Sequence, residues 1–275
     1  DWSSDVCSSD LMSEIMRVAP WSLRALGQPF GVAERGTKLL TWTHAAVGHA
    51  LELLRVGEGR LRQSAEAPAA LRGGSQDAGR RIDANGRNLI ELGPPAVDLA
   101  VCDARLSGQG DVVIGQAIGT LMVPSLADLL SRRGLNGIVA FHAGRDEVRL
   151  EGWRPEGWVG VLTAPSGPVF AIGACTELPA IADLFGGGMR SRIRRHAGLL
   201  SEAAQAGKGM VTLAVTATSP REPWRPEATV DYPARVARAY REGLEVTVED
   251  LAHLYALERI TWAPTSERSR KQAGY

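Results

Sequence analysis

The fold class is decided by residues 111–142, which read DVVIGQAIGTLMVPSLADLLSRRGLNGIVAFH. The short apolar runs at 111–114 and 137–142 are rich in β-branched residues and predict two strands. Residues 124–133 predict a helix between them, because the run begins with proline and Gly134 stands just past its end. A strand, a helix and a second strand in this order are typical of an α/β protein.

The same alternation extends over the rest of the chain. Further strands are predicted at 88–92, 97–102, 147–150, 158–163, 169–174 and 210–218. Further helices are predicted at 179–185, 190–206, 233–241 and 247–259. The last of these begins with Thr247 and carries Asp250 three residues on, in the manner of a capping box. We therefore predict an α/β core at 88–262, with a mixed sheet and interleaved helices.

A helical segment is predicted to precede this core, at 12–58. Within it, apolar residues recur at helical spacing over 31–55, which indicates one long amphipathic helix, or two with Gly48 as the weak point. Residues 59–87 are rich in Ala, Arg, Gly and Ser and predict a linker or surface excursion. Residues 263–275 form a polar tail.

The first eleven residues, DWSSDVCSSDL, are not expected to belong to the protein. One choice of codons for them reproduces a widely used sequencing-library adapter, so the reading frame is expected to come from assembled metagenomic reads. Such a technical segment is excluded from fold reasoning. Without Asp1, Asp5 and Asp10, the net charge becomes +3 instead of 0.

Composition excludes several classes of protein. A hydrophobic content of 44% over 275 residues indicates a globular chain. The sequence contains no run of about 18 apolar residues, so no membrane span is predicted. The positive charge is small and dispersed, so it does not predict nucleic-acid binding. Cys102 and Cys175 form no CxxC motif, which argues against a disulfide framework or a structural zinc site. We expect a cytoplasmic protein, and homo-oligomerisation is left open.

Two stretches of the sequence resemble each other. Residues 117–129 and 171–184 each contain Ala-Ile-Gly, then a proline, then an apolar residue followed by Ala-Asp-Leu. A duplicated unit would place two proline-led helix N-termini, each favouring an anion, near one cleft. The alternative is chance recurrence of a common strand-to-helix pattern.

The densest charge cluster supplies candidate anion-binding residues. Arg190 and Arg194 share one helix face at i, i+4 spacing, and guanidinium groups suit carboxylate or phosphate recognition. Gly187 and Gly188 precede them and offer backbone N–H groups at a helix start. The alternatives are a solvated helix face and a glycine hinge.

Candidate acid–base residues are His142 and Glu177. His142 ends a predicted strand, where ligands gather in open α/β sheets. Glu177 lies in the turn before Pro179, beside Cys175, which lacks a local partner base and is expected to be a buried thiol. No HExxH, GxGxxG or P-loop motif occurs. We therefore predict no metal site and assign no cofactor.

Short segments at both ends of the chain resemble a bacterial family catalogued as a domain of unknown function. They are Met16-Arg17-Val18, residues 29–34 with Trp42 downstream, and residues 264–270. The resemblance implies no activity, cofactor or catalytic residue.

The leading hypothesis is a cytoplasmic enzyme or ligand-processing protein that acts on a small anionic metabolite, either a carboxylate or a phosphate. Its site is expected where the turns before Pro124 and Pro179 meet residues 186–194. There, Arg190 and Arg194 would bind the anion and His142 or Glu177 would transfer protons. One alternative is a non-catalytic assembly or binding protein that docks a partner on helix 31–55. The other is an NAD(P)-dependent oxidoreductase without the GxGxxG fingerprint.

Overall fold

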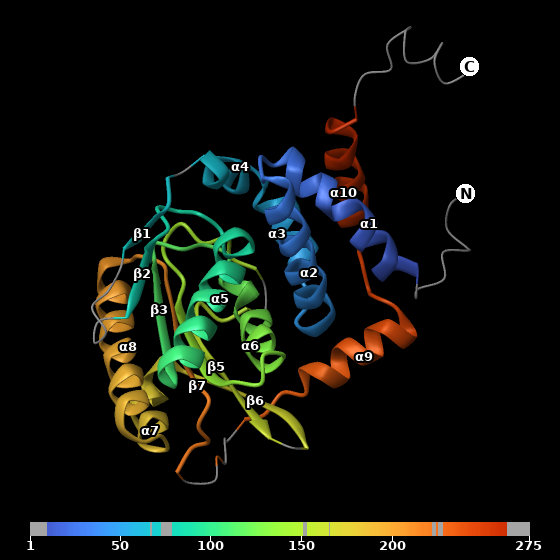
Figure 1. Cartoon of the computed structure of the whole chain (residues 1–275). Helices are drawn as coiled ribbons and strands as arrows, with labels where there is room; N and C mark the ends of the chain where they lie inside the picture. The colour runs from blue at the N-terminus through green and yellow to red at the C-terminus, as the bar shows by residue number, and fades with distance from the viewer. Residues whose placement is uncertain are drawn as a thin grey trace, which may run out of the picture.

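Seven strands form one mixed sheet at the centre of the protein (Figure 1). The structure is a computed structural model that describes residues 10–66, 68–72, 79–150, 153–164, 166–221, 224 and 228–262. The strand order is β1-β2-β3-β7-β4-β5-β6. The strands are β1 Ala70–Arg72, β2 Arg80–Asp83, β3 Gln109–Gly115, β4 Asn136–His142, β5 Glu156–Ala164, β6 Gly167–Gly173 and β7 Met210–Thr216. Within this sheet, β2 and β3 pair in parallel and the other pairs are antiparallel. The predicted α/β class with a mixed sheet is confirmed.

Helices cover both faces of the sheet. They are α1 Asp10–Ala25, α2 Phe30–Ala46, α3 Ala50–Val56, α4 Glu58–Glu66, α5 Leu89–Ser107, α6 Val123–Ser131, α7 Leu178–Asp183, α8 Gly187–Ala206, α9 Tyr232–Glu242 and α10 Val248–Ile260, with 3-10 turns η1 Thr120–Met122 and η2 Cys175–Glu177. Successive strand residues point to opposite faces. Val112 and Ile114 pack in one core with α5 and α6, whereas Val113 packs in a second core with α7 and α8.

The first and last helices pack against each other, beyond the layer of α5 and α6 (Figure 1). Helix α1 contacts both α2 and α10, and the Ser22 hydroxyl donates a hydrogen bond to the carbonyl oxygen of Leu254 at 2.8 Å. The expected amphipathic stretch at 31–55 forms two helices, because Gly48 adopts a φ of 87° and His49 a φ of 60°. The C-terminal helices therefore belong with the N-terminal helical segment in space.

The predicted strands at 88–92 and 97–102 are wrong, since both lie in or at the start of α5. The Asn88 side chain caps this helix by accepting a hydrogen bond from the Ile90 N–H at 2.8 Å. The buried residues Val97, Ala100, Val101 and Ala104 follow helical spacing. Packing of this apolar face against β3 stabilises the helix in spite of Pro94 and Pro95 near its start.

Two other segments differ from expectation. The predicted strand at 147–150 is a loop. Residues 59–87, expected to be a linker or surface excursion, supply most of α4, the edge strand β1 and its neighbour β2 in their described part. The remaining predicted strands and helices are confirmed to within three residues at each end. Thr247 caps α10 as predicted, with its hydroxyl accepting from the Asp250 N–H at 3.1 Å. The expected adapter segment, except for its last two residues, and the polar tail lie outside the described residues.

Candidate functional site

The two proline-led helices do not meet in one cleft. Helix α6 follows β3 and α7 follows β6, and the strands β7, β4 and β5 lie between β3 and β6. Four strand spacings of about 4.8 Å separate the ends of β3 and β6 by about 19 Å along the sheet. The helices also cover opposite faces, as their separate cores show. The expected site at the meeting of the two turns is therefore not formed.

The helix start before Pro124 does hold an anion, and this anion is the carboxylate of Glu147. The Gly119 N–H donates to the two carboxylate oxygens at 2.8 and 3.1 Å, and the Thr120 N–H lies 3.3 Å from each. The Glu147 side chain is 9% exposed. Burial raises the pKa of this carboxyl to about 7, against the lowering effect of the two N–H groups.

Glu147 is expected to make the free energy of unfolding depend on pH. Its pKa is higher in the folded state, about 7, than the ordinary value of 4.5, so the folded state binds its proton more tightly. The stabilisation is complete below pH 4.5 and is lost as the pH rises through 7, an effect of about 3 kcal/mol. Urea unfolding of the wild type and of Glu147→Gln should reveal it. The difference between the two proteins should change by that amount between pH 4.5 and 8, and an unchanged difference would contradict the prediction.

The helix start before Pro179 is capped by its own glutamate. The Glu177 carboxylate accepts a hydrogen bond from the Ala174 N–H at 3.1 Å. The neighbouring Cys175 thiol lies 3.3 Å from the carbonyl oxygens of both Phe141 and Gly157. Burial raises the pKa of this thiol to about 11, so it remains protonated and unreactive.

His142 and the two candidate arginines contact different carboxylates in different parts of the structure. His142 ends β4, and its Nδ1 atom is 3.7 Å from the Glu156 carboxylate on β5. Arg194 Nη2 is 2.6 Å from Asp183 Oδ1 on α7, and Arg190 Nε is 3.6 Å from the same oxygen. The structure thus brings Arg190 and Arg194 together on a carboxylate of their own chain.

Gly187 and Gly188 begin α8 just before these arginines, Gly187 with a φ of 47°. A Cβ at Gly188 would overlap the Gln109 side chain, so this turn packs closely against β3. No hydrogen bond or ion pair in the described part of the chain links Arg190 or Arg194 to His142 or Glu177.

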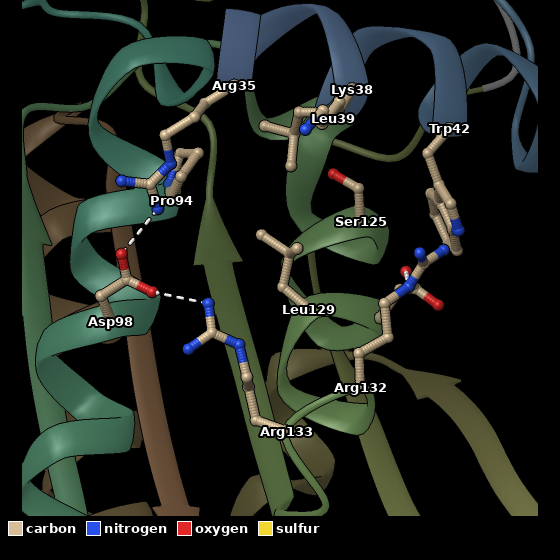
Figure 2. Close-up of a pocket in the computed structure, with 11 residues that line it drawn as sticks. Arg35, Lys38, Leu39, Trp42, Pro94, Asp98, Ser125, Leu129, Arg132 and Arg133 are labelled. Atoms are coloured by element: carbon tan, nitrogen blue, oxygen red, sulfur yellow. Dashed lines mark hydrogen bonds and ion pairs between the residues drawn. The ribbon is translucent and has the colours of Figure 1, made fainter. Parts of the chain in front are cut away.

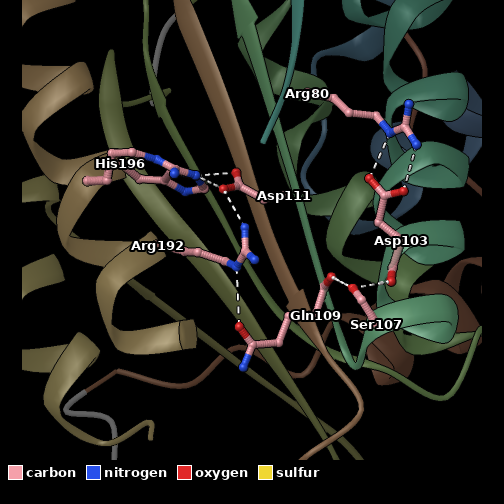
Figure 3. Close-up of polar contacts among 8 residues, drawn as sticks. Arg80, Asp103, Ser107, Gln109, Asp111, Arg192 and His196 are labelled. Carbon is pink, nitrogen blue, oxygen red and sulfur yellow. Dashed lines mark hydrogen bonds and ion pairs between the residues drawn. The ribbon is translucent and has the colours of Figure 1, made fainter. Parts of the chain in front are cut away.

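Side chains on the other face of α8 contact the buried carboxylate of Asp111 on β3 (Figure 3). Arg192 Nη1 lies 3.2 Å from Asp111 Oδ2, and His196 Nε2 lies 2.7 Å from Asp111 Oδ1. Arg195 also pairs with Asp111. Burial and the two guanidinium groups lower the pKa of His196 to about 3, so the neutral imidazole donates its Nε2–H to the carboxylate. This cluster fastens α8 to the sheet.

A pocket of about 220 Å³ lies between α2, α5 and α6 (Figure 2). Its lining is Arg35, Lys38, Leu39, Trp42, Pro94, Asp98, Ser125, Asp128, Leu129, Arg132 and Arg133. Four cationic side chains stand against two carboxylates, and the floor includes the buried Leu39 and Trp42. The volume is below the range typical of drug-sized ligands, so the pocket suits a small anion and is too small for a dinucleotide.

Two carboxylates organise the cations of this pocket. Asp98 Oδ2 lies 2.7 Å from Arg35 Nη2, and Asp98 Oδ1 lies 3.0 Å from Arg133 Nη2, so one side chain ties α2 to the end of α6 (Figure 2). Asp128 is 8% exposed and accepts from Arg132 Nε at 2.6 Å. It also accepts from the Trp42 indole, and burial raises its pKa.

Sequence reasoning missed this pocket. In the sequence, Arg35 and Lys38 fall at polar positions of the amphipathic stretch 31–55, and Asp128 falls within the internal repeat at 117–129. The spacing of Asp128 and Arg132 at i, i+4 is a signal of a helical ion pair, not of a ligand site. The pocket depends on three helices that are distant in sequence.

Metal sites and membrane spans are absent from the part of the chain that the structure describes. Among the described residues, no group of three or more His, Cys, Asp or Glu side chains could hold a metal ion. None of the helices in the described ranges is long and apolar enough to cross a membrane.

Comparisons with known proteins show the fold. No family model matches the chain, and no curated protein matches its sequence. A dehydrogenase from Sinorhizobium meliloti matches with a TM-score of 0.64 and 16% identity, covering 90% of this chain and 98% of its own. Malate dehydrogenase from Pyrococcus horikoshii matches with a TM-score of 0.64 and 11% identity, covering 92% and 95%. Sulfolactate dehydrogenase from Methanocaldococcus jannaschii matches with a TM-score of 0.63 and 11% identity, covering 90% and 95%. The chain thus has the fold of these dehydrogenases over nearly its whole length.

Proposed function

We propose that this protein is an oxidoreductase that acts on a small carboxylate. The supporting observation is the likeness to dehydrogenases over nearly the whole of both chains, two of which are named for malate and sulfolactate. Both compounds are small hydroxy acids, and their dehydrogenation converts a hydroxyl group into a carbonyl. The proposal keeps the small anionic substrate of the leading hypothesis and adopts the oxidoreductase chemistry of its alternative.

The pocket between α2, α5 and α6 supports the substrate class. Guanidinium groups bind carboxylates with paired, charge-assisted hydrogen bonds, and three arginines line this pocket. Oxidation of a hydroxyl group also needs a base for the hydroxyl proton. Asp128 lines the pocket and has a pKa raised by burial, so it is suited to take that proton. Asp128 is therefore the proposed acid–base residue.

The hydride acceptor is expected to be a nicotinamide dinucleotide, as in the alternative hypothesis. A Rossmann-type cradle needs a glycine-rich turn at the carboxyl ends of parallel strands. The sequence has no GxGxxG motif, and β2–β3 is the only parallel pair among the described strands. The pocket of about 220 Å³ is too small for a dinucleotide. The described residues do not fit a cradle of that type, and we assign none of them to the dinucleotide.

An assay of the purified full chain tests the proposal. Malate, sulfolactate and lactate are each supplied with NAD⁺ or NADP⁺, and the absorbance of the reduced nicotinamide is followed. We expect saturable reduction with at least one pair of substrate and dinucleotide. The proposal fails if no pair is turned over and neither dinucleotide shifts the melting temperature.

A second candidate is a non-catalytic protein that binds small carboxylates. The favouring observation is that the predicted acid–base residues do not line the pocket: His142 lies beside Glu156 on β5, and Glu177 caps a helix. For such a protein, small acids would raise the melting temperature while NAD⁺ and NADP⁺ would stay oxidised.

A further inference from the structure

We propose that the pocket between α2, α5 and α6 selects a small ligand with two anionic groups, such as a dicarboxylate or a carboxylate that also carries a sulfonate or phosphate. The identification of this ligand as the substrate rests on the proposed function. The binding site itself depends only on the charges of the pocket and their placement.

The charge balance of the pocket favours a dianion. Asp98 divides its two oxygens between Arg35 and Arg133, so these two cations share one negative charge. Asp128 neutralises Arg132, whereas Lys38 forms no ion pair with any residue in the described ranges. The lining therefore carries a net charge of +2, which a ligand with two negative charges would balance.

The placement of the cations favours two separate anionic groups. Arg35 and Lys38 come from α2 on one side of the pocket, and Arg132 and Arg133 come from the end of α6 on the other (Figure 2). A short molecule with an acidic group at each end would contact both sides at once. Asp98 already bridges Arg35 and Arg133 from the two sides, so Lys38 is the cation that a second acidic group would neutralise.

The buried apolar residues at the bottom of the pocket strengthen the attraction between its cations and an anionic ligand. Leu39, Trp42 and Pro94 are buried and limit the water beneath the ligand. A lower local dielectric increases the attraction between opposite charges. Each guanidinium group also has unused donors, because Arg35 and Arg133 each engage Asp98 through a single nitrogen.

Calorimetric titration of the full chain tests the selectivity. The probes are succinate as the dicarboxylate, sulfoacetate as the mixed dianion, inorganic phosphate as a single-centre anion, and propionate as the monoanion. We expect succinate or sulfoacetate to bind at least tenfold more tightly than propionate and phosphate. Equal affinity for all four probes would overturn the proposal. Separate titrations with succinate and sulfoacetate show whether a carboxylate or a sulfonate is preferred as the second anionic group.

A matched pair of lysine variants locates the site. Lys38→Met removes one charge-assisted contact and should weaken binding of the preferred dianion about tenfold. Lys208→Met makes the same change at an exposed lysine between α8 and β7 and should leave the affinity unchanged. Lys38 is exposed in the free protein, so its variant should melt at the wild-type temperature. An unchanged affinity in Lys38→Met would overturn the proposal.

The two proposals can fail separately. Dianion binding that depends on Lys38, without reduction of NAD⁺ or NADP⁺, would uphold the binding site and contradict the oxidoreductase. Turnover of a small carboxylate with unchanged kinetic constants in Lys38→Met would uphold the oxidoreductase and contradict the pocket.

Discussion

Asp128→Asn is expected to lower kcat roughly 10²–10⁴-fold, the usual contribution of a general acid or base, with little change in substrate affinity. Asparagine has the shape of aspartate and keeps an acceptor oxygen for the Trp42 indole, but it cannot take up a proton. The measurement is steady-state oxidation of the preferred small carboxylate, with affinity measured by calorimetry. A variant with full kcat would remove Asp128 from the proposed chemistry.

The pH dependence of kcat gives an independent test of Asp128. Burial raises the pKa of this carboxyl above its ordinary value of 3.8. Since the ionised form accepts the hydroxyl proton, activity should rise with pH as the group loses its proton. This acid limb should disappear from the residual activity of Asp128→Asn.

Asp98→Asn is the matched control, because it makes the same isosteric change in the same pocket. Asp98 is 41% exposed and bridges Arg35 and Arg133. Loss of its charge should change KM through the altered positions of the two arginines, with kcat close to that of the wild type. Equal losses of kcat in both variants would indicate a general disturbance of the pocket.

The α/β class was predictable because much of the deciding information is local. Over residues 111–142, the β-branched runs, the proline-led helix and the following glycine all indicate the same elements, and the structure contains β3, α6 and β4 there. Residues 88–102 were harder to interpret. The short apolar runs at 88–92 and 97–102 favoured two strands, although the spacing of Val97, Ala100, Val101 and Ala104 is helical. The packing of α5 against β3 decides between these interpretations, and that contact cannot be read from local sequence.

The candidate site was less predictable because its contacts are not local. The sequence indicated that a helix start before Pro124 favours an anion, and this chemistry is present. The anion is Glu147, which lies 28 residues from Gly119 in a segment expected to be a strand. In the same way, Arg190 and Arg194 converge on a carboxylate, but it belongs to Asp183. Such internal partners become visible only once the chain is folded.

Asp111→Ala is expected to lower the free energy of unfolding by roughly 3–5 kcal/mol, the usual cost of removing one member of a buried ion pair. Asp111 is 2% exposed and is the shared acceptor for Arg192, Arg195 and His196. Its removal deprives these α8 side chains of a common carboxylate beside β3, and burial makes a lost polar partner costly. Urea unfolding measures the effect, and Asp111→Asn, which keeps an acceptor oxygen, should lose less.

Asp98→Ala provides the contrast for this stability prediction. Asp98 also binds two arginines, but it is 41% exposed, and water can replace it as their partner. Ion pairs at such positions contribute about 1 kcal/mol or less. A similar small loss in Asp111→Ala would mean that α8 is held to the sheet by its apolar face alone, through Met189, Ile193 and Leu200. The larger loss would show that the ion-pair cluster at the start of α8 is a structural clamp for the sheet, which would explain why Arg192, Arg195 and His196 face Asp111 instead of a ligand.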